Sequence, residues 1–118
     1  WDPARLRAWV RQNVEDYWAD WVARAQRPWG GLGLLRGGTV AWGVLGIGRM
    51  LYTLRTGEVT SKSGAGQWMP GVVEPQWREI VEEALRIRRT GRGGMGSLRR
   101  RRDALGFMTM VLELIRAG

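Results

Sequence analysis

Apolar residues recur along the chain at three- and four-residue intervals, the spacing of one face of an α-helix. A first helix is predicted over residues 5–26, where Asp2 suits the N-cap and Pro3 the first helical turn. A second helix is predicted over residues 40–55, apolar nearly all round and followed by Gly57, a residue type favoured at helix C-termini. We expect this second helix to be central and buried.

Three further helices are predicted in the second half of the chain. Ser61 can cap a short helix over residues 62–68, and Pro75 opens the next helix. After a glycine-rich segment, which we interpret as a flexible joint, Ser97 caps a last helix with a heptad-like apolar stripe. No stretch alternates polar and apolar residues long enough to predict a strand. The sequence therefore predicts an all-α fold, a single five-helix bundle domain over residues 1–118.

Glycine and tryptophan add detail to this bundle. Gly43, Gly46 and Gly48 lie within the second helix, although glycine costs up to about 1 kcal/mol per helical position. They indicate a surface where another helix or a ligand comes close, and helix packing is the interpretation we favour. The chain has eight tryptophans. Six occupy positions that predict a core or half-core place: Trp9, Trp18, Trp21, Trp42, Trp68 and Trp77.

The composition excludes several classes of chemistry. The chain has no cysteine and no histidine. Zinc fingers, cysteine nucleophiles, Ser-His-Asp triads and haem-ligating histidines are therefore excluded. The absence of cysteine suits a reducing cytoplasm, the location we predict, and no apolar run approaches the roughly 20 residues of a membrane span. Because the first residue is tryptophan rather than methionine, we expect a piece of a longer protein.

The charge is strongly positive, with 19 Lys and Arg against 11 Asp and Glu and a net charge of +8. Eight arginines and no acid lie between residues 86 and 102. Such a run can bind a nucleic-acid backbone. We do not favour this function, since half of the run lies at a helix start, where cations are unfavourable. A stand-alone basic helical module that binds nucleic acid or another polyanion remains the alternative.

Acidic residues offer little for metal chemistry. Asp16 and Asp20 share a helix face, but the simpler interpretation is a solvated face on which Asp20 pairs with Arg24. The sequence has neither an Asp-x-Asp pair nor a Walker A loop, so we predict no metal ligands and no catalytic residues in this chain. Lys62 is the only lysine among the basic residues. It is either a chance survivor of an arginine-rich composition or a position where arginine does not serve.

One segment carries a family resemblance. Residues 44–68 read VLGIGRMLYTLRTGEVTSKSGAGQW. This segment resembles the C-terminal helical domain of bacterial aminoglycoside adenylyltransferases of the streptomycin 3''-type, which are two-domain nucleotidyltransferases. The family pattern is filled by Arg49, Tyr52, Thr56-Gly57, Ser61-Lys62 and Gln67-Trp68. Two flanking segments also fit, namely PQWREIVEEALRIRRTG at 75–91 and the Asn-x-x-x-Tyr-Trp motif at 13–18.

The resemblance implies specific roles. In the family a separate N-terminal domain carries the Gly-Ser motif, the magnesium-binding carboxylates and the catalytic base. This chain is then a substrate- and nucleotide-contacting domain that is inactive in isolation, with ATP and magnesium belonging to the parent enzyme. Arg49 and Lys62 are implied to reach the ATP phosphates. The implied substrate-binding residues are Trp29, which falls close to a family tryptophan that packs on the antibiotic, and Thr39, Tyr52 and Trp68.

The sequence also departs from the family. Residues 21–57 contain no Asp or Glu, and Thr39 stands where the family has an acid that holds ammonium groups of the antibiotic. A polycationic aminoglycoside would meet no counter-charge there, so the small-molecule acceptor is left open. Gly64 and Gly66 replace small alanines, which we expect to loosen the short helix. The partners we predict are the N-terminal nucleotidyltransferase domain in cis and the acceptor, without a membrane; a homodimer stays possible.

Overall fold

The computed structural model describes residues 2–118, and Trp1 lies outside the described part. The first helical run is continuous from Pro3 to Ala25 but changes its winding midway. It consists of α1 (Pro3–Asn13), a π-helical segment (Val14–Trp18) and α2 (Ala19–Ala25). The Asp2 side chain accepts a hydrogen bond from the Ala4 amide at 3.0 Å, which confirms the predicted N-cap. The π-helical segment was not predicted from the sequence.

The remaining helices begin and end close to their predicted positions. A 3₁₀ turn (Leu32–Leu35) leads into α3 (Gly37–Thr56), and α4 (Lys62–Trp68) follows. A second 3₁₀ turn (Met69–Gly71) continues from α4, and a third (Pro75–Trp77) precedes α5 (Arg78–Thr90); the last helix is α6 (Leu98–Ala117). Gly57 and Gly91 end their helices with φ of 76° and 69°, a left-handed conformation that glycine adopts without strain. The five-helix all-α fold is confirmed, with the first run counted as one helix.

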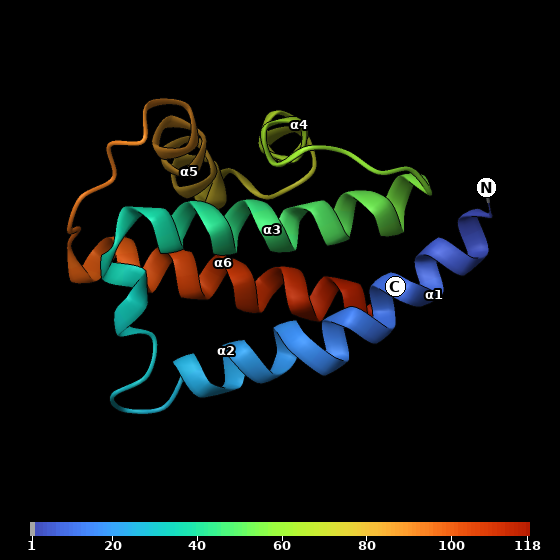
Figure 1. The fold of residues 1–118 in the computed structure, drawn as a ribbon, viewed down its shortest axis with the longest axis horizontal. Helices are drawn as coiled ribbons and strands as arrows, with labels where there is room; N and C mark the ends of the chain where they lie inside the picture. The colour runs from blue at the N-terminus through green and yellow to red at the C-terminus, as the bar shows by residue number, and fades with distance from the viewer. Residues whose placement is uncertain (1) are drawn as a thin grey trace.

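Helix α3 is the centre of the bundle. Figure 1 shows α6 alongside α3 in the same direction, the α1–α2 run in the opposite direction, and α4 and α5 crossing α3 on its other side. Twelve residues of α3 are buried, as predicted for the apolar central helix. Leu45 and Ile47 of this helix and Phe107 of α6 are completely buried in one continuous core.

Glycines in α3 and α4 allow this close packing. A Cβ atom at Gly43 would lie 2.8 Å from the Met108 sulfur, and one at Gly46 would lie 2.7 Å from the Trp18 ring. A Cβ at Gly48 would clash with Met69 of the α4 end. The predicted small-residue surface therefore serves helix packing. In α4, Gly66 lies against Leu85, so the missing side chain allows close contact with α5.

Replacing Gly46 with alanine is expected to lower the free energy of unfolding by about 1–3 kcal/mol, because the added methyl overpacks a rigid indole. Gly38→Ala in the same helix is the matched control. A Cβ there meets nothing within 4 Å, and the better helix propensity of alanine is worth up to about 1 kcal/mol. Thermal or urea unfolding of the two variants compares them directly. Equal stability of the two would contradict this account of the packing.

Two sequence expectations are corrected by the structure. Trp9 was assigned to the core or half-core, but 56% of it is exposed. The segment around Gly93 was interpreted as a flexible joint. Instead its backbone touches that of Gly37, whose amide donates to the Gly94 carbonyl at 2.8 Å, so the α5–α6 connection is held against the start of α3.

Across residues 2–118, none of the helices combines the length and apolar character that crossing a bilayer requires.

Candidate functional site

The structure brings Arg49 and Lys62 close to one another at the junction of α3 and α4. Lys62 is the first residue of α4, which Ser61 caps by accepting a hydrogen bond from the Gly64 amide at 2.9 Å. The Arg49 Nε donates to the Thr60 carbonyl at 3.1 Å and so ties α3 to the turn before α4. Both basic side chains are half-buried. The two residues predicted to contact phosphates therefore lie in one neighbourhood.

A third cation, Arg88 of α5, belongs to the same cluster. The pKa of Lys62 is lowered from its ordinary value of 10.5, first by burial and then by the positive charges of Arg88 and Arg49. Three helices thus direct like charges at one place, an arrangement that an anion would relieve. Arg88 was predicted only as part of the arginine run, and its place beside Lys62 was not predicted. The sequence shows only that Arg88 lies three residues before the Gly91 cap of its helix. That α5 packs beside α4, and so brings Arg88 near Lys62, is decided by the tertiary fold.

An open cavity of about 250 Å³ adjoins Lys62. It is lined by Gly38, Ala41, Trp42, Lys62, Ile87, Arg88 and Gly91. The lining contains two cations and no acid. This cavity can therefore hold an anionic group beside an aromatic ring.

Arg49 lines a different cavity, of about 310 Å³, on its other side. The walls come from α1, α3 and the turn before α4: Leu6, Trp9, Arg49, Met50, Thr53, Val59 and Thr60. Apart from Arg49 and the two threonines this lining is apolar, and 56% of Trp9 and 61% of Val59 are exposed. Arg49 thus lies between a charged cavity and an apolar one.

The other predicted substrate residues lie apart from the two cavities. Tyr52 and Trp68 pack edge to face with ring centroids 5.2 Å apart, joining the end of α3 to α4. Trp29, in the loop before α3, is 86% exposed. Thr39 is half-buried and sits near Gly33 of the first 3₁₀ turn. Neither cavity is lined by any of these four residues, and their roles stay predictions.

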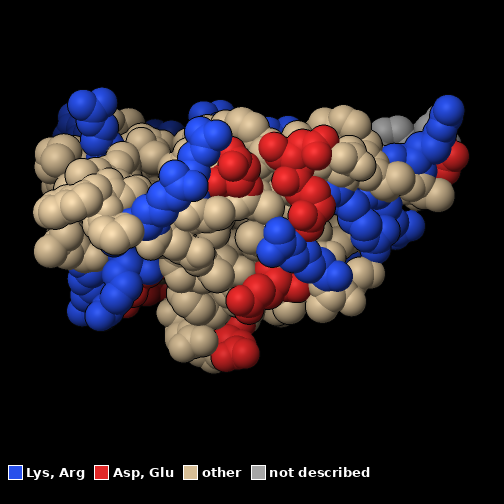
Figure 2. Space-filling model, turned by 90° about the horizontal axis from the view of Figure 1, so that it is seen from below, with Lys and Arg blue, Asp and Glu red and all other residues tan. Residues whose placement is uncertain are grey.

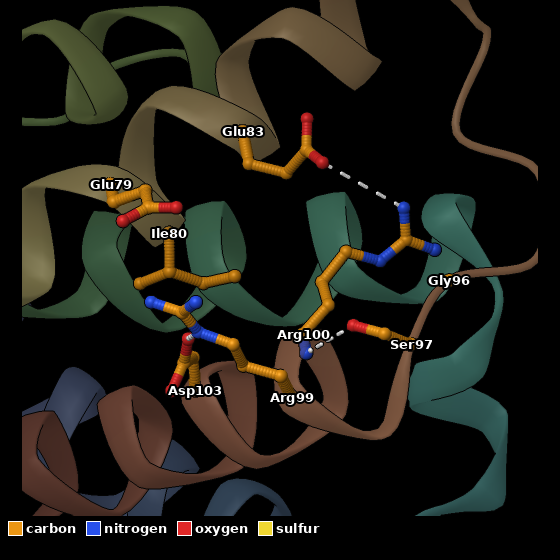
Figure 3. Close-up of a pocket in the computed structure, with 8 residues that line it drawn as sticks. All are labelled: Glu79, Ile80, Glu83, Gly96, Ser97, Arg99, Arg100 and Asp103. Atoms are coloured by element: carbon orange, nitrogen blue, oxygen red, sulfur yellow. Dashed lines mark hydrogen bonds and ion pairs between the residues drawn. The ribbon is translucent and has the colours of Figure 1, made fainter.

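The arginines at the start of α6 are largely engaged within the protein. Arg100 donates to the carbonyls of Gly93, Leu35 and Gly94 at 2.9, 3.0 and 3.1 Å, and lies 3.9 Å from Glu83. Figure 3 shows Glu83 of α5 pointing at this guanidinium, beside Gly96. Arg101 donates to the Gly30 carbonyl.

The two other arginines of this group, Arg99 and Arg102, are mostly exposed and each lie 3.8 Å from Asp103. The surface available to a polyanion at α6 is therefore smaller than the arginine count indicates.

Several acidic side chains are paired on the surface. Asp20 pairs with Arg24 at 3.0 Å, as predicted, and Asp16 accepts hydrogen bonds from Gln12. In Figure 2 acidic and basic side chains alternate across one face of the molecule. Within residues 2–118 no three acidic side chains are grouped closely enough to hold a metal ion.

Comparison with known proteins supports the resemblance seen in the sequence. The family model described as "Aminoglycoside adenylyltransferase, C-terminal domain" matches residues 38–105, more than half of the chain. No curated protein and no solved structure gives a significant match. The matched range contains Arg49, Lys62 and Arg88, and hence the whole cationic cluster. The chain belongs to the family of aminoglycoside adenylyltransferase C-terminal domains.

Proposed function

We propose that this chain is the C-terminal helical domain of an ATP-dependent nucleotidyltransferase and that its cationic cluster contacts the phosphates of ATP. The observation that carries the proposal is the convergence of Lys62, Arg49 and Arg88 from three helices, with a lowered pKa at Lys62. An ammonium and guanidinium groups neutralise triphosphate charge, and guanidinium adds planar hydrogen bonding. Together they stabilise the pyrophosphate leaving group.

The domain supplies binding and no acid–base chemistry in this proposal. The magnesium ligands and the base are assigned to an N-terminal domain in cis, because the described residues offer no cluster of acids for a metal. We therefore expect the chain alone to be inactive. The cytoplasm, where ATP is available, is the location we propose.

The apolar cavity beside Arg49 supports such a covering domain. Its exposed Trp9 and Val59 give α1 and the α3–α4 turn an apolar surface next to the cations. Apolar surface of this kind is typical of a site that another protein surface covers. Reading the gene upstream of the Trp1 codon tests the proposal. A preceding domain with Gly-Ser and Asp-x-Asp motifs is expected, and a native start codon at this position would overturn it.

The structure favours this function over a nucleic-acid interface. The guanidinium groups of Arg100 and Arg101 donate to backbone carbonyls, so they are not available to a phosphate backbone. The cavity that Lys62 and Arg88 line, in contrast, has no acidic residue in its lining.

Replacing Arg88 with alanine is expected to weaken pyrophosphate binding by about threefold to tenfold, the loss of one exposed charge near the ligand. Calorimetric titration of the intact protein with pyrophosphate measures this. Arg89→Ala is the matched control, because Arg89 is an exposed neighbour on the same helix that does not line the cavity. We expect Arg89→Ala to change the affinity by less than about twofold. If both variants lost the same pyrophosphate affinity, the effect would come from the change in net charge, and the proposed contact of Arg88 would be contradicted.

A further inference from the structure

The Lys62 cavity has an aromatic residue in its lining as well as two cations. Trp42 of α3 lines the cavity together with Ala41 and Ile87, both of which are buried. The lining thus combines an indole with two cations. It provides an apolar face for a second chemical group, placed beside the one that the cations hold.

The Trp42 ring is fixed in place by three aromatic neighbours. It stacks on Trp18 with ring centroids 4.9 Å apart, and it meets Trp21 and Tyr17 edge to face at 5.2 and 6.2 Å. These three residues come from the π-helical segment and the start of α2. A ring held by its neighbours binds a ligand without a further ordering cost, so the part of Trp42 that lines the cavity is preorganised.

The mouth of the cavity is kept free by glycine. A Cβ at Gly38 or at Gly91 would meet nothing within 4 Å, so the space in front of both residues is open. The volume of about 250 Å³ exceeds the 150 Å³ or so that holds one benzene molecule. The cavity therefore accommodates one ring together with a small polar group.

The charges around this wall argue against a cationic occupant. The cavity lining holds Lys62 and Arg88 and no carboxylate. The acids nearest in sequence to the aromatic cluster are engaged elsewhere, since Asp20 pairs with Arg24 and Asp16 accepts from Gln12. A ligand bearing several ammonium groups would meet repulsion at the two cations and no carboxylate in the lining to offset it.

We propose that the acceptor substrate of this enzyme is a hydroxyl compound that lays an uncharged flat ring on Trp42, rather than a polyamine sugar. The inference rests on the proposed function, in which ATP phosphates occupy Lys62 and Arg88. The acceptor hydroxyl oxygen attacks the α-phosphorus and forms a new P–O bond. The bond to the β-phosphate oxygen breaks, pyrophosphate leaves, and the hydroxyl proton goes to the base of the catalytic domain. The acceptor must therefore lie beside the phosphates, which is where Trp42 stands.

The test compares two probes on the intact protein in the presence of magnesium and α,β-methylene-ATP, which cannot release pyrophosphate. The first is 4-nitrophenyl β-glucoside, an uncharged aryl ring with hydroxyl groups, and the second is streptomycin. Saturation-transfer NMR and calorimetry follow binding. We expect the aryl glucoside to bind at least about tenfold more tightly than streptomycin. Tighter binding of streptomycin would overturn the inference.

Variants separate the ring contact from the phosphate contact. Trp42→Leu is expected to weaken aryl glucoside binding about tenfold or more, the usual effect of losing one stacking partner, and to leave pyrophosphate affinity unchanged. Trp77→Leu is the matched control, because Trp77 is a half-buried indole that packs on Phe107 away from the cavity. Unchanged aryl glucoside binding in Trp42→Leu would overturn the inference while leaving the phosphate site intact.

A second variant guards against loss of folding in Trp42→Leu. Gly38→Leu fills the cavity from its open mouth, where no atom lies within 4 Å of the new Cβ, so the fold should be retained. We expect it to abolish aryl glucoside binding, and full binding in this variant would contradict the placement of the ring. Failure of the proposed function is distinguishable, since pyrophosphate would then bind Lys62→Ala and the wild type equally.

Discussion

Arg100→Ala is expected to lower the free energy of unfolding by about 2–4 kcal/mol. The guanidinium donates to three backbone carbonyls, and only 11% of the side chain is exposed. Those carbonyls belong to the segment before α3 and to the α5–α6 connection, two regions that approach through Gly37 and Gly93. Truncation leaves the carbonyls without this donor. The Arg100 Nε is itself buried without an acceptor among the described residues. Truncation removes this unsatisfied donor as well, so the expected loss of stability does not exceed the upper end of the range.

Arg99→Ala is the matched control for Arg100→Ala. The two residues are neighbours on α6 and carry the same charge, but 72% of the Arg99 side chain is exposed. Its ion pair with Asp103 is long, at 3.8 Å, so we expect a change within about 0.5 kcal/mol. Urea unfolding followed by circular dichroism measures both variants. If Arg99→Ala proves as destabilising as Arg100→Ala, the carbonyl contacts are not what holds this end of the bundle.

Lys62→Ala is expected to weaken pyrophosphate and ATP binding by about tenfold to a hundredfold, the range for losing one charge-assisted hydrogen bond to a phosphate. Lys62 is half-buried, and the positive charges of Arg88 and Arg49 act on its ammonium, so an anion bound there gains from more than one cation. Lys62→Arg keeps the charge but replaces a compact ammonium with a planar guanidinium. We expect it to bind with intermediate affinity, which separates the geometry of this position from its charge.

Calorimetric titration of the intact protein measures these affinities, with Arg89→Ala as the control for loss of one positive charge. Circular dichroism shows whether each variant is folded. If Lys62→Ala bound pyrophosphate with wild-type affinity, Lys62 would not be a phosphate contact. An equal loss in Arg89→Ala would assign the effect to net charge alone.

Local signals predicted most of the fold. Asp2, Ser61 and Ser97 each accept the capping hydrogen bond that their residue type favours, and Gly57 ends α3 with a positive φ. The apolar character of the second helix correctly placed it at the centre. These features depend on short-range chemistry, which the sequence displays directly.

Features set by tertiary contact could not be predicted in this way. The π-helical segment around Tyr17 carries Trp18, which packs against Gly46, a residue 28 positions away in sequence. Trp9 follows the apolar stripe of the first helix, but in the fold it lines an open cavity beside Met50 and Thr53 of α3, and 56% of it is left exposed. The glycines near Gly93 were interpreted as flexible because nothing in the sequence shows that they meet Gly37.

The same distinction between local signals and tertiary contacts applies to the residues of the candidate site. Arg49 and Lys62 were predicted from a family motif, and in the fold the charge of Arg49 acts on Lys62 although the two residues line different cavities. Arg88 was missed, since an arginine within a basic run carries no local sign of the helix it will face. Trp42 was assigned to packing from its helical position. Its place between the aromatic cluster and the cations appears only once α3, α4 and α5 are assembled.

The single lysine of this chain allows the most direct test of the phosphate site. With ¹⁵N-lysine labelling this chain contributes one side-chain ammonium signal, that of Lys62, which Lys62→Arg assigns by removing it. We predict that its pKa lies below the ordinary 10.5 in the free protein, because of burial and the charges of Arg88 and Arg49. Bound anion favours the charged form, so pyrophosphate should raise this pKa, and affinity should fall as pH rises past the free-state value. An unchanged pKa with pyrophosphate bound would place the anion elsewhere and contradict the account.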